Sequence, residues 1–544
     1  MRRALRISAA AVFAALAFTP GLARATSVEE FPDNGSEQEG RGGAWVARAS
    51  DPLATFYNPA GLAGQPTRLT LQANISTQHT CFTRVKSAND TTVDSVGANG
   101  QYPQVCNKGS FFPDPQLAFT YRLTPRIGLG LAVLGPSAVG NVSWPEFVNG
   151  NQPSPQRYML ISNNTVLLTP TIGIGWEALD GLRLGASFIA GTAPTIDFVN
   201  AAPAQNSDGV QPDQNDLHNE LKAKALFIPG FTLGAIWSPS SNLDVAAWYK
   251  WSDSVHAKGD LTTASTYFTN AVANGDLKGV TYGDTAEPYC QTLAAGQAPP
   301  PGGAKCGSGN NASIRVPVPM EAKLGLRFHQ PRRDVPQDSH LRDPIAQDVF
   351  DLEADFTWAN DSAFQGIQIR FPGDASGNGI LPANPAIPSG TIPANADVTH
   401  AFRDVFGVRL GGDYNLLPDQ LALRAGAFFE TQAANSVYQN IDFDGAERFG
   451  FALGGTYRIR LGAEKKQALE FMAGYGHVFF GTLDNNNPNA NGLPALTGIA
   501  CRNGLPASAP CTGGQQPYRT AWPINLGNIT SSINVINVGA SFKF

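Results

Sequence analysis

The side chains that most often carry out catalysis or bind metals occur here without the spacing that such chemistry needs. The seven histidines form no HExxH pair, and the sequence contains neither a GxSxG turn nor a Walker phosphate loop. Asp442-Phe443-Asp444-Gly445 resembles the start of a calcium loop, but the glutamate that completes such a loop is missing. We interpret this stretch as an ordinary turn, and the sequence predicts no enzyme, no metal site and no cofactor.

The cysteines are the second set of reactive side chains, and they form no CxxC pair. In an exported chain, cysteines are typical of disulfides rather than of metal ligands. Pairing of sequence neighbours is the simplest of the many possible connectivities, and it gives Cys81–Cys106, Cys290–Cys306 and Cys501–Cys511.

Export itself is indicated by the first 25 residues. Three arginines lie within the first six positions, an apolar run extends from Ala9 to Phe18, and Ala23-Arg24-Ala25 fits the small-x-small cleavage rule. We expect residues 1–25 to be a signal peptide and the mature chain to begin at Thr26.

From about residue 67 to the C-terminus the sequence alternates between apolar and polar residues, which is the period of a β-strand. In residues 448–461, for example, Phe449, Phe451 and Leu453 alternate with Arg448, Gly450 and Ala452. The pattern predicts fourteen strands, with approximate spans 68–79, 116–123, 126–139, 163–177, 182–199, 223–237, 242–260, 312–329, 346–369, 401–415, 420–431, 447–461, 467–482 and 532–544.

The connections between these strands alternate between long and short, and the cysteines fall in or beside the long ones. An even number of strands, short turns at one end and long loops at the other are typical of outer-membrane barrels, which close so that every backbone polar group is satisfied in lipid. We therefore predict an all-β fold, a 14-stranded antiparallel transmembrane β-barrel over residues 67–544. A soluble β-sandwich or β-helix is the alternative.

Residues 26–66 show neither clean helical nor clean strand periodicity. Within them, Gly40-Arg41-Gly42-Gly43-Ala44 and Phe56-Tyr57-Asn58-Pro59-Ala60-Gly61-Leu62-Ala63 resemble the N-terminus of the long-chain fatty acid outer-membrane transporters of the FadL/TodX type. Residues 316–325, 402–411 and 445–457 are also similar to this family, so the resemblance extends over nearly the whole mature chain.

The resemblance implies a monomeric barrel whose residues 26–66 plug the lumen as a hatch, with Asn58, Pro59 and Ala60 in that hatch. It implies passive uptake of long-chain fatty acids or other hydrophobic small molecules, by ligand-gated hatch movement and diffusion through a gap beside a kinked third strand. In this chain Gly135-Pro136 ends that strand, and such a pair marks an edge or a bulge. We place the lateral-opening kink there; the alternative is that the strand simply ends at a loop.

The family's characterised members hold the ligand carboxylate with basic lumenal residues, and this chain departs from them. The positions that match, around Phe198 and around Val398, are not basic, although His400 and Arg403 lie close to the second. We name His400, Arg403 and Phe198 as candidate ligand contacts. A neutral apolar or aromatic compound would fit as well as a fatty acid.

Charged residues recur on the strand face that we expect to line the lumen, from Glu321 to Glu470. They could serve the substrate or the gate, or they could form salt bridges with one another in a wet lumen. Arg41 and Asp51 are the expected partners on the plug side.

Composition limits the expected partners. The net charge of −6 at pH 7 argues against a nucleic acid. The expected partners are a hydrophobic small molecule, outer-membrane lipid with lipopolysaccharide, and the barrel-assembly machinery of a Gram-negative cell. The competing functions are a general porin, a channel for aromatic compounds or alkanes, an outer-membrane hydrolase and an adhesive barrel.

Overall fold

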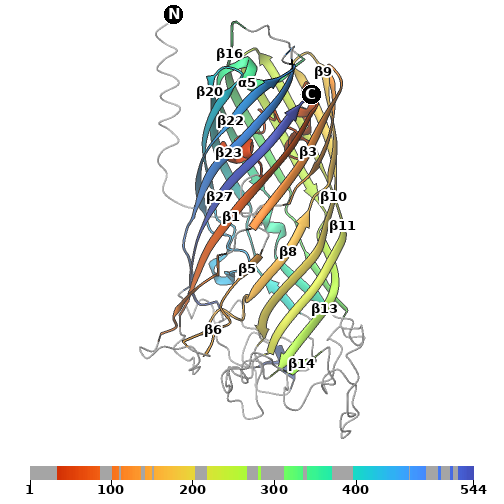
Figure 1. Ribbon diagram of the computed structural model, residues 1–544. Helices are drawn as coiled ribbons and strands as arrows, with labels where there is room; N and C mark the ends of the chain where they lie inside the picture. Colours follow the sequence, from red (N-terminus) through yellow and green to blue (C-terminus); the bar gives the residue numbers. More distant parts are fainter. Residues whose placement is uncertain are drawn as a thin grey trace, which may run out of the picture.

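The computed structural model shows a tall barrel of antiparallel strands with the N-terminal part of the chain inside it (Figure 1). The structure describes residues 34–85, 101–109, 112–135, 141–149, 152–202, 217–265, 280–282, 311–334, 340–370, 396–462, 464, 466–485, 500–503, 515–518 and 525–544. The predicted signal peptide and residues 26–33 of the predicted plug lie outside these residues.

The described chain runs along the barrel wall fourteen times, as the sequence predicts, and we call each of these passages a stave. Some staves are split into two strands by a short break. In chain order the staves are β1 (Arg68–Arg84); β3 (Phe112–Thr124); β4 (Ile127–Val133); β8 (Ser162–Leu168) with β9 (Thr171–Leu179); β10 (Leu182–Ala202); β11 (Leu217–Ser240); β12 (Leu243–Ser252) with β13 (Val255–Ser265); β15 (Asn311–Val316) with β16 (Glu321–Pro331); β17 (Asp348–Ala359) with β18 (Gly366–Arg370); β19 (Ala396–Thr399) with β20 (Val405–Leu417); β21 (Leu421–Glu430); β22 (Arg448–Leu461); β23 (Gln467–Phe480) with β24 (Leu483–Asn485); and β27 (Gly527–Lys543).

The barrel is closed by its first and last staves. β27 pairs with β1 over the full length of both, from Arg68–Lys543 at one end to Arg84–Gly527 at the other. Closure leaves no exposed sheet edge at this seam, so backbone N–H and C=O groups that face lipid are paired between strands.

Shorter strands extend the wall or lie in the connections. β2 (Gln104–Cys106) pairs with β1, β5 (Asn141–Ser143) with β8, and β14 (Val280–Tyr282) with β13. Two small hairpins stand apart from the barrel sheet: β6 (Phe147–Val148) with β7 (Gln152–Pro153), and β25 (Ala500–Asn503) with β26 (Gln515–Tyr518).

The two faces of the wall differ in chemistry, as the alternating sequence predicts. In β22, Phe449, Phe451 and Leu453 are exposed on the outside, whereas Arg448 and Arg458 are buried on the inside. The same alternation runs around the barrel and gives an apolar outer band with tryptophan and tyrosine among its exposed residues, which suits a wall that faces lipid.

The two ends of the barrel differ in the length of their connections. Tight turns join β9 to β10, β11 to β12 and β20 to β21 at the end that also carries the C-terminus, at the top of Figure 1. We call this the periplasmic end and the opposite end extracellular. One periplasmic connection is longer, between β16 and β17, and it contains α5 (Pro344–Gln347).

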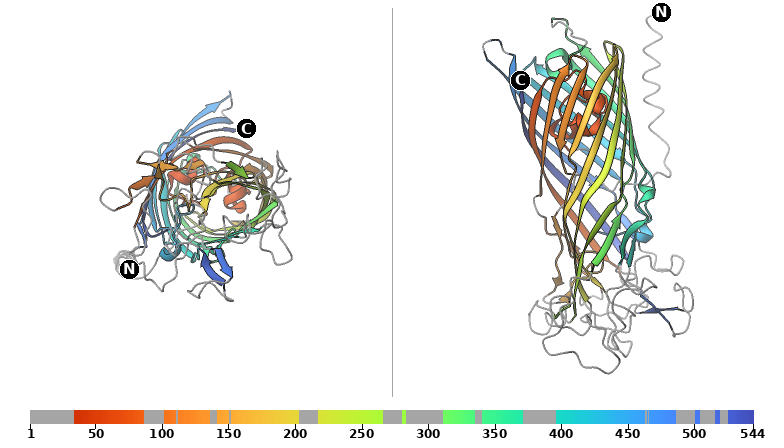
Figure 2. Two further views of the ribbon diagram at one scale, coloured as in Figure 1. Left: turned by 90° about the horizontal axis from the view of Figure 1, so that it is seen from below. Right: turned by 90° about the vertical axis from the view of Figure 1, so that its right-hand side faces the viewer.

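Residues 34–66 lie inside the barrel, and we call them the plug (Figure 2). They form α2 (Ser36–Gly40), α3 (Ala54–Tyr57) and the 3-10 helix η1 (Pro59–Leu62), and nearly every side chain among them is buried. Two further 3-10 turns are η4 (Asp361–Ala363), in the break between β17 and β18, and η5 (Ser436–Tyr438), in the extracellular connection between β21 and β22. None of the helices in the described residues has the length and apolar character that a membrane crossing requires.

Candidate ligand site beside the plug

A buried arginine fixes the plug to one side of the lumen. Arg41 is fully buried, and its guanidinium lies 2.6 Å from Asp351, 2.7 Å from Asp413 and 3.1 Å from Glu353, on β17 and β20. These contacts confirm the prediction that Arg41 joins the plug to the lumenal charges. Asp51 behaves differently: its carboxylate accepts hydrogen bonds from Gln38 and from the backbone N–H of Leu53, both within the plug.

The same wall binds the plug backbone directly. The N–H groups of Trp45 and Val46 donate to the carboxylate of Asp355 at 2.8 and 3.1 Å, and the N–H of Ala47 donates to Glu353 at 2.6 Å. Arg48, a residue that sequence reasoning did not single out, bridges Asp351 and Asp413. Charges on β17 and β20 therefore satisfy polar groups of a plug segment that has little regular structure of its own.

The opposite wall receives Asn58-Pro59-Ala60 on a bed of glycines, which we call the glycine seat. It consists of Gly128 on β4, Gly175 on β9, Gly185 on β10 and Gly234 on β11. A Cβ atom at Gly185 would lie 2.2 Å from the backbone N of Ala60, and one at Gly175 would lie 2.5 Å from the carbonyl oxygen of Pro59. Only glycine allows two backbones to approach this closely.

Asn58 shapes the turn that fits this seat. Its side-chain oxygen accepts from the N–H of Ala60 at 3.2 Å, and its amide donates to the carbonyl of Val46 at 2.7 Å. Pro59 then occupies the first position of η1, where its missing N–H costs nothing. The Asn-Pro pair thus begins a helical turn and ties the two halves of the plug together.

Backbone pairing is interrupted beside Gly135, at the end of the third stave. The β3–β4 ladder stops at the pair Leu117–Val133, although Leu134 and Gly135 follow in the described chain. On the other side, the carbonyl of Leu134 still accepts from Thr169 at 2.7 Å. The site at which we predicted the kink is therefore a break in the ladder between β3 and β4; Pro136 lies outside the described residues.

Two prolines line the β3 edge of this break. Backbone polar groups point to alternate sides along an antiparallel strand. The backbone carbonyl of Leu134 points to β9, so the backbone polar groups of Val133 point to β3 and those of its partner Leu117 point to β4. Pro113 and Pro115 are two and four residues from Leu117, so their backbone groups point to the same side as those of Leu117. Proline has no N–H, so this edge exposes fewer unpaired donors than an ordinary strand edge would.

The first described residue of the plug closes this break from inside. The Asn34 side-chain amide donates to the carbonyl of Gly135 at 2.6 Å and to the carboxylate of Asp114 on β3. Its oxygen accepts from Asn74 on β1, and its backbone N–H donates to the hydroxyl of Tyr57 at 2.7 Å. All of these residues are buried. The N-terminal end of the plug is therefore bonded to β1, to β3 and to the end of the third stave.

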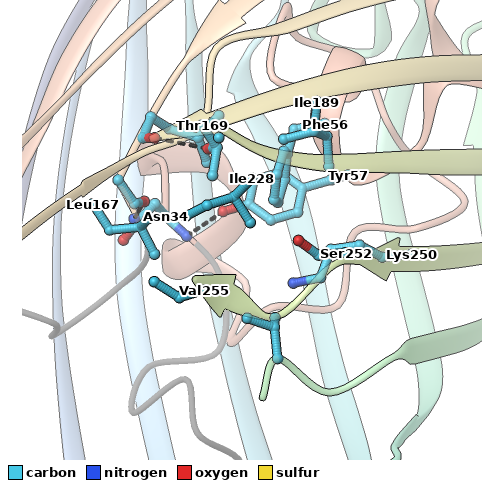
Figure 3. A pocket seen from close by; sticks show the side chains of 14 residues that line it. Asn34, Phe56, Tyr57, Leu167, Thr169, Ile189, Ile228, Lys250, Ser252 and Val255 are labelled. Atoms are coloured by element: carbon cyan, nitrogen blue, oxygen red, sulfur yellow. Dashed lines mark hydrogen bonds between the residues drawn. The ribbon is translucent and has the colours of Figure 1, made fainter. Parts of the chain in front are cut away.

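A cavity of about 50 Å³ lies next to Asn34, between the plug and staves three to eight (Figure 3). Its lining is mainly apolar, with Phe56, Leu167, Ile189 and Ile228 among the residues. Lys250 supplies the one charged side chain of the lining in the described residues, and it forms an ion pair with Glu321 on β16. Sequence reasoning missed Lys250 because its distance from the plug depends on how the staves are arranged.

An apolar wall leads from this cavity towards the extracellular end. It comprises inward-facing residues of five staves that pack together, and we call it the apolar wall: Ala193, Ile196, Phe198, Leu221, Ala223, Ala225, Ile228, Val255, Ala257, Ala312, Ile314, Val316, Ile367 and Ile369. Phe198 also packs against a second cluster, nearer the extracellular end, that includes Trp144, Met159, Phe364 and Phe402. Phe198, a predicted ligand contact, thus lies where the two clusters meet.

The other two predicted ligand contacts lie away from the cavity lining. His400 is fully buried among Phe364, Phe402 and Phe443, and its ring nitrogens contact the carbonyl of Val398 and the carboxylate of Asp442. Arg403 is exposed. A binding role for these two residues stays a prediction. Asp442 and Asp444 form no metal-ligand group with other residues in the described chain.

One disulfide lies at the extracellular end, where Cys81 of β1 is bonded to Cys106 of β2, as predicted. Cys290, Cys306 and Cys511 lie outside the described residues, and only the backbone of Cys501 is described. The other two predicted pairings therefore stay predictions.

Solved structures with this fold cover almost the whole chain. A FadL homologue of Pseudomonas aeruginosa aligns with a TM-score of 0.61 and 15% identity, over 96% of this chain and 100% of that chain. The toluene transporter TodX of P. putida gives 0.54 and 14%, over 95% and 99%. CymD, a monoaromatic hydrocarbon channel, gives 0.51 and 12%, over 95% and 98%. At identities this low, the structural similarity shows a shared fold alone.

Family membership comes from the sequence itself. No curated protein matches the chain. Residues 21–498 match the family described as outer membrane protein transport protein (OMPP1/FadL/TodX). The chain therefore belongs to this family of outer-membrane β-barrels that transport hydrophobic compounds.

Proposed function

We propose that this barrel takes up hydrophobic small molecules, long-chain fatty acids among them, without an energy source. The ligand passes from the extracellular cluster along the apolar wall to the cavity beside Asn34. It then leaves sideways into the membrane through the break in the ladder beside Gly135.

One observation carries this proposal: the apolar wall, the cavity and the break are continuous. Ile228 and Val255 belong both to the cavity lining and to the apolar wall, and Gly135 belongs both to the lining and to the break. A polar solute gains nothing from such a route, whereas an apolar ligand stays out of water along it. The charged wall of β17 and β20 is occupied by the plug, which argues against a general porin.

Passage requires part of the plug to move. The cavity holds about 50 Å³, less than the roughly 150 Å³ of a cavity that admits benzene. Asn34 both lines the cavity and bonds to Asp114 and Gly135, which lie on the two sides of the break. We place the moving part at this N-terminal end of the plug, because Asn58-Pro59-Ala60 is held against the glycine seat.

The ligand has an apolar body and at most one polar group that Lys250 can meet. Burial contributes about 0.8 kcal/mol per CH₂ group, so ten methylenes supply the roughly 8 kcal/mol that corresponds to micromolar affinity. An ion pair is therefore not required. Because Glu321 already pairs with Lys250, a monoaromatic hydrocarbon is the second candidate ligand, and solved structures of similar fold are described as channels for such compounds.

Uptake of two probes by the double variant Lys250→Met, Glu321→Gln separates these ligands. The double change removes the ion pair without leaving one charge unpaired in the lumen. If the ligand is a carboxylate, uptake of a labelled long-chain fatty acid falls while uptake of toluene is retained. Equal uptake of the fatty acid by wild type and variant would show that Lys250 takes no part in recognition and that burial of the apolar body is sufficient. If the wild type takes up neither probe, the proposed function fails.

A further inference from the structure

The described C-terminal part of the long periplasmic connection crosses the mouth of the barrel on the periplasmic side of the plug. Its residues 340–347, which we call the strap, include α5, near the periplasmic end of the barrel in Figure 1. Arg342 and Asp343 are both buried within it, although they lie in a connection between two strands. A connection that only joins β16 to β17 would not need buried charges.

The strap binds the plug from the periplasmic side. The backbone N–H of Arg342 donates to the carbonyl of Gly64 at 2.9 Å. Its guanidinium donates to the carbonyls of Ala47 at 3.0 Å and of Arg48 at 3.2 Å. Arg342 thus contacts two parts of the plug: the part around Ala47 that β17 holds, and Gly64, which follows the turn that lies on the glycine seat.

The strap is also fixed around the circumference of the barrel. Asp343 pairs with Arg458 on β22 at 2.6 Å and with Lys543 on β27, and Arg342 pairs with Asp244 on β12 at 3.2 Å. The ring of His340 contacts Glu177 on β9 at 2.8 Å. Asn415 on β20 donates to the carbonyl of Pro344 at 2.9 Å. These partners come from staves four, seven, ten, twelve and fourteen, so the strap extends across the opening.

We propose that the strap acts together with the glycine seat to hold the plug across the periplasmic mouth, with Arg342 and Asp343 as the positioning residues of the strap. It holds the plug on its periplasmic side and keeps the periplasmic mouth shut to ions while a hydrophobic ligand leaves through the wall. The break beside Gly135 opens to lipid, so the lateral route does not require the mouth to open.

Current through the full-length protein in a planar lipid bilayer tests the strap. The variants are Arg342→Ala, which removes the guanidinium bonds to the plug, and Asp343→Ala, which removes the link to β22 and β27. Arg332→Ala is the matched control, because Arg332 lies in the same connection and pairs at the surface with Asp334. A shift in gel mobility on heating shows whether each variant is a folded barrel. If Asp343→Ala does not fold, Asp343→Asn, which keeps the side-chain shape, replaces it.

We expect wild type and Arg332→Ala to stay closed, and the strap variants to show open-channel current that the wild type lacks. Folded strap variants that stay as closed as the wild type would overturn the proposal. Uptake of a labelled fatty acid by the same variants keeps this test apart from the proposed function. Loss of uptake in a variant that remains closed would count against the ligand route and not in favour of the strap.

Discussion

At the scale of single residues, the glycine seat determines how the plug can fit. Gly128, Gly175, Gly185 and Gly234 come from four neighbouring staves and face the same turn. Alternation in the sequence places these glycines on the inward face of their strands, but it does not show which plug atoms they meet. That information depends on the three-dimensional path of residues 34–66.

Gly185→Ala tests the seat. The new Cβ would lie 2.2 Å from backbone atoms of Pro59 and Ala60, so the plug must shift. We expect a barrel that still folds but passes ion current, because overpacking costs about 1–3 kcal/mol and the plug is the part that can yield. Bilayer recordings check this, with Gly109→Ala as the control, since its Cβ would have no neighbour closer than 3.9 Å. A Gly185→Ala barrel that is as closed as the wild type would contradict the tight fit.

The charge on Asp343 makes the strap sensitive to acid. Burial alone would raise the pKa of Asp343, but Arg458 and Lys543 outweigh burial and hold this pKa well below its ordinary value. The unfolded chain therefore takes up a proton near pH 4 that the folded protein does not. The contribution of Asp343 to stability is complete above that pH and is lost as the pH falls below it.

The melting temperatures of wild type and Asp343→Asn, compared at several pH values, measure this contribution. We expect the wild type to be more stable at pH 7 and the difference to shrink below about pH 4. A difference that is the same at pH 7 and at pH 3 would show that the carboxylate charge does not hold the strap.

At the scale of elements, the strands were the most predictable part of the molecule. A period of two over ten or more residues, as in β22, specifies both the strand and its lipid-facing side. The short turns were predictable for the same reason, because they separate such runs. The break between β8 and β9 and the late start of β20 at Val405 carry no signal in the alternation, and they differ from the predicted continuous strands.

Other elements could not be predicted from the periodicity of apolar and polar residues. The helices α2, α3 and η1 have four or five residues each, too few for a helical period to appear. In the sequence, the connection between β16 and β17 stands out from the other periplasmic turns only by its length. Its role depends on Arg342 and Asp343 meeting residues that are distant in the sequence, such as Lys543.

The edge of β3 gives a prediction at this scale. Pro113 and Pro115 leave two positions without N–H groups on the side that faces the break. The double variant Pro113→Ala, Pro115→Ala restores both donors, so this edge can pair with an opposing strand and narrow the passage. We expect slower uptake of a labelled fatty acid by a barrel that remains folded. Pro229→Ala, a strand proline away from the break, serves as the control, and equal uptake by all three proteins would contradict this role.

At the scale of the whole molecule, the barrel is divided into a polar and an apolar half. Charges on β17, β20 and β22 hold the plug and the strap, whereas inward residues of β10, β11, β13, β15 and β18 form the apolar wall. The division depends on the stave to which each residue belongs and on its level along the barrel axis, since β17 and β18 belong to one stave. Sequence alternation separates inside from outside, but it cannot separate one side of the lumen from the other.

Our central proposal is that an apolar ligand leaves through the wall beside Gly135, and this division supports it. Pro115 on β3 and Leu168 on β8 lie at the same level on either side of Gly135, by continuation of the ladders at each side. Two strand spacings of about 4.8 Å separate such positions. A short bifunctional thiol reagent can therefore link cysteines placed there, and the described residues contain no free cysteine that would compete.

The most direct measurement is fatty-acid uptake by the Pro115→Cys, Leu168→Cys protein before and after this link is made. Lateral exit predicts that linking stops uptake, while each single-cysteine variant takes up fatty acid at the same rate before and after treatment with the reagent. Uptake that continues at the unlinked rate in the linked barrel would show that the ligand leaves by another route.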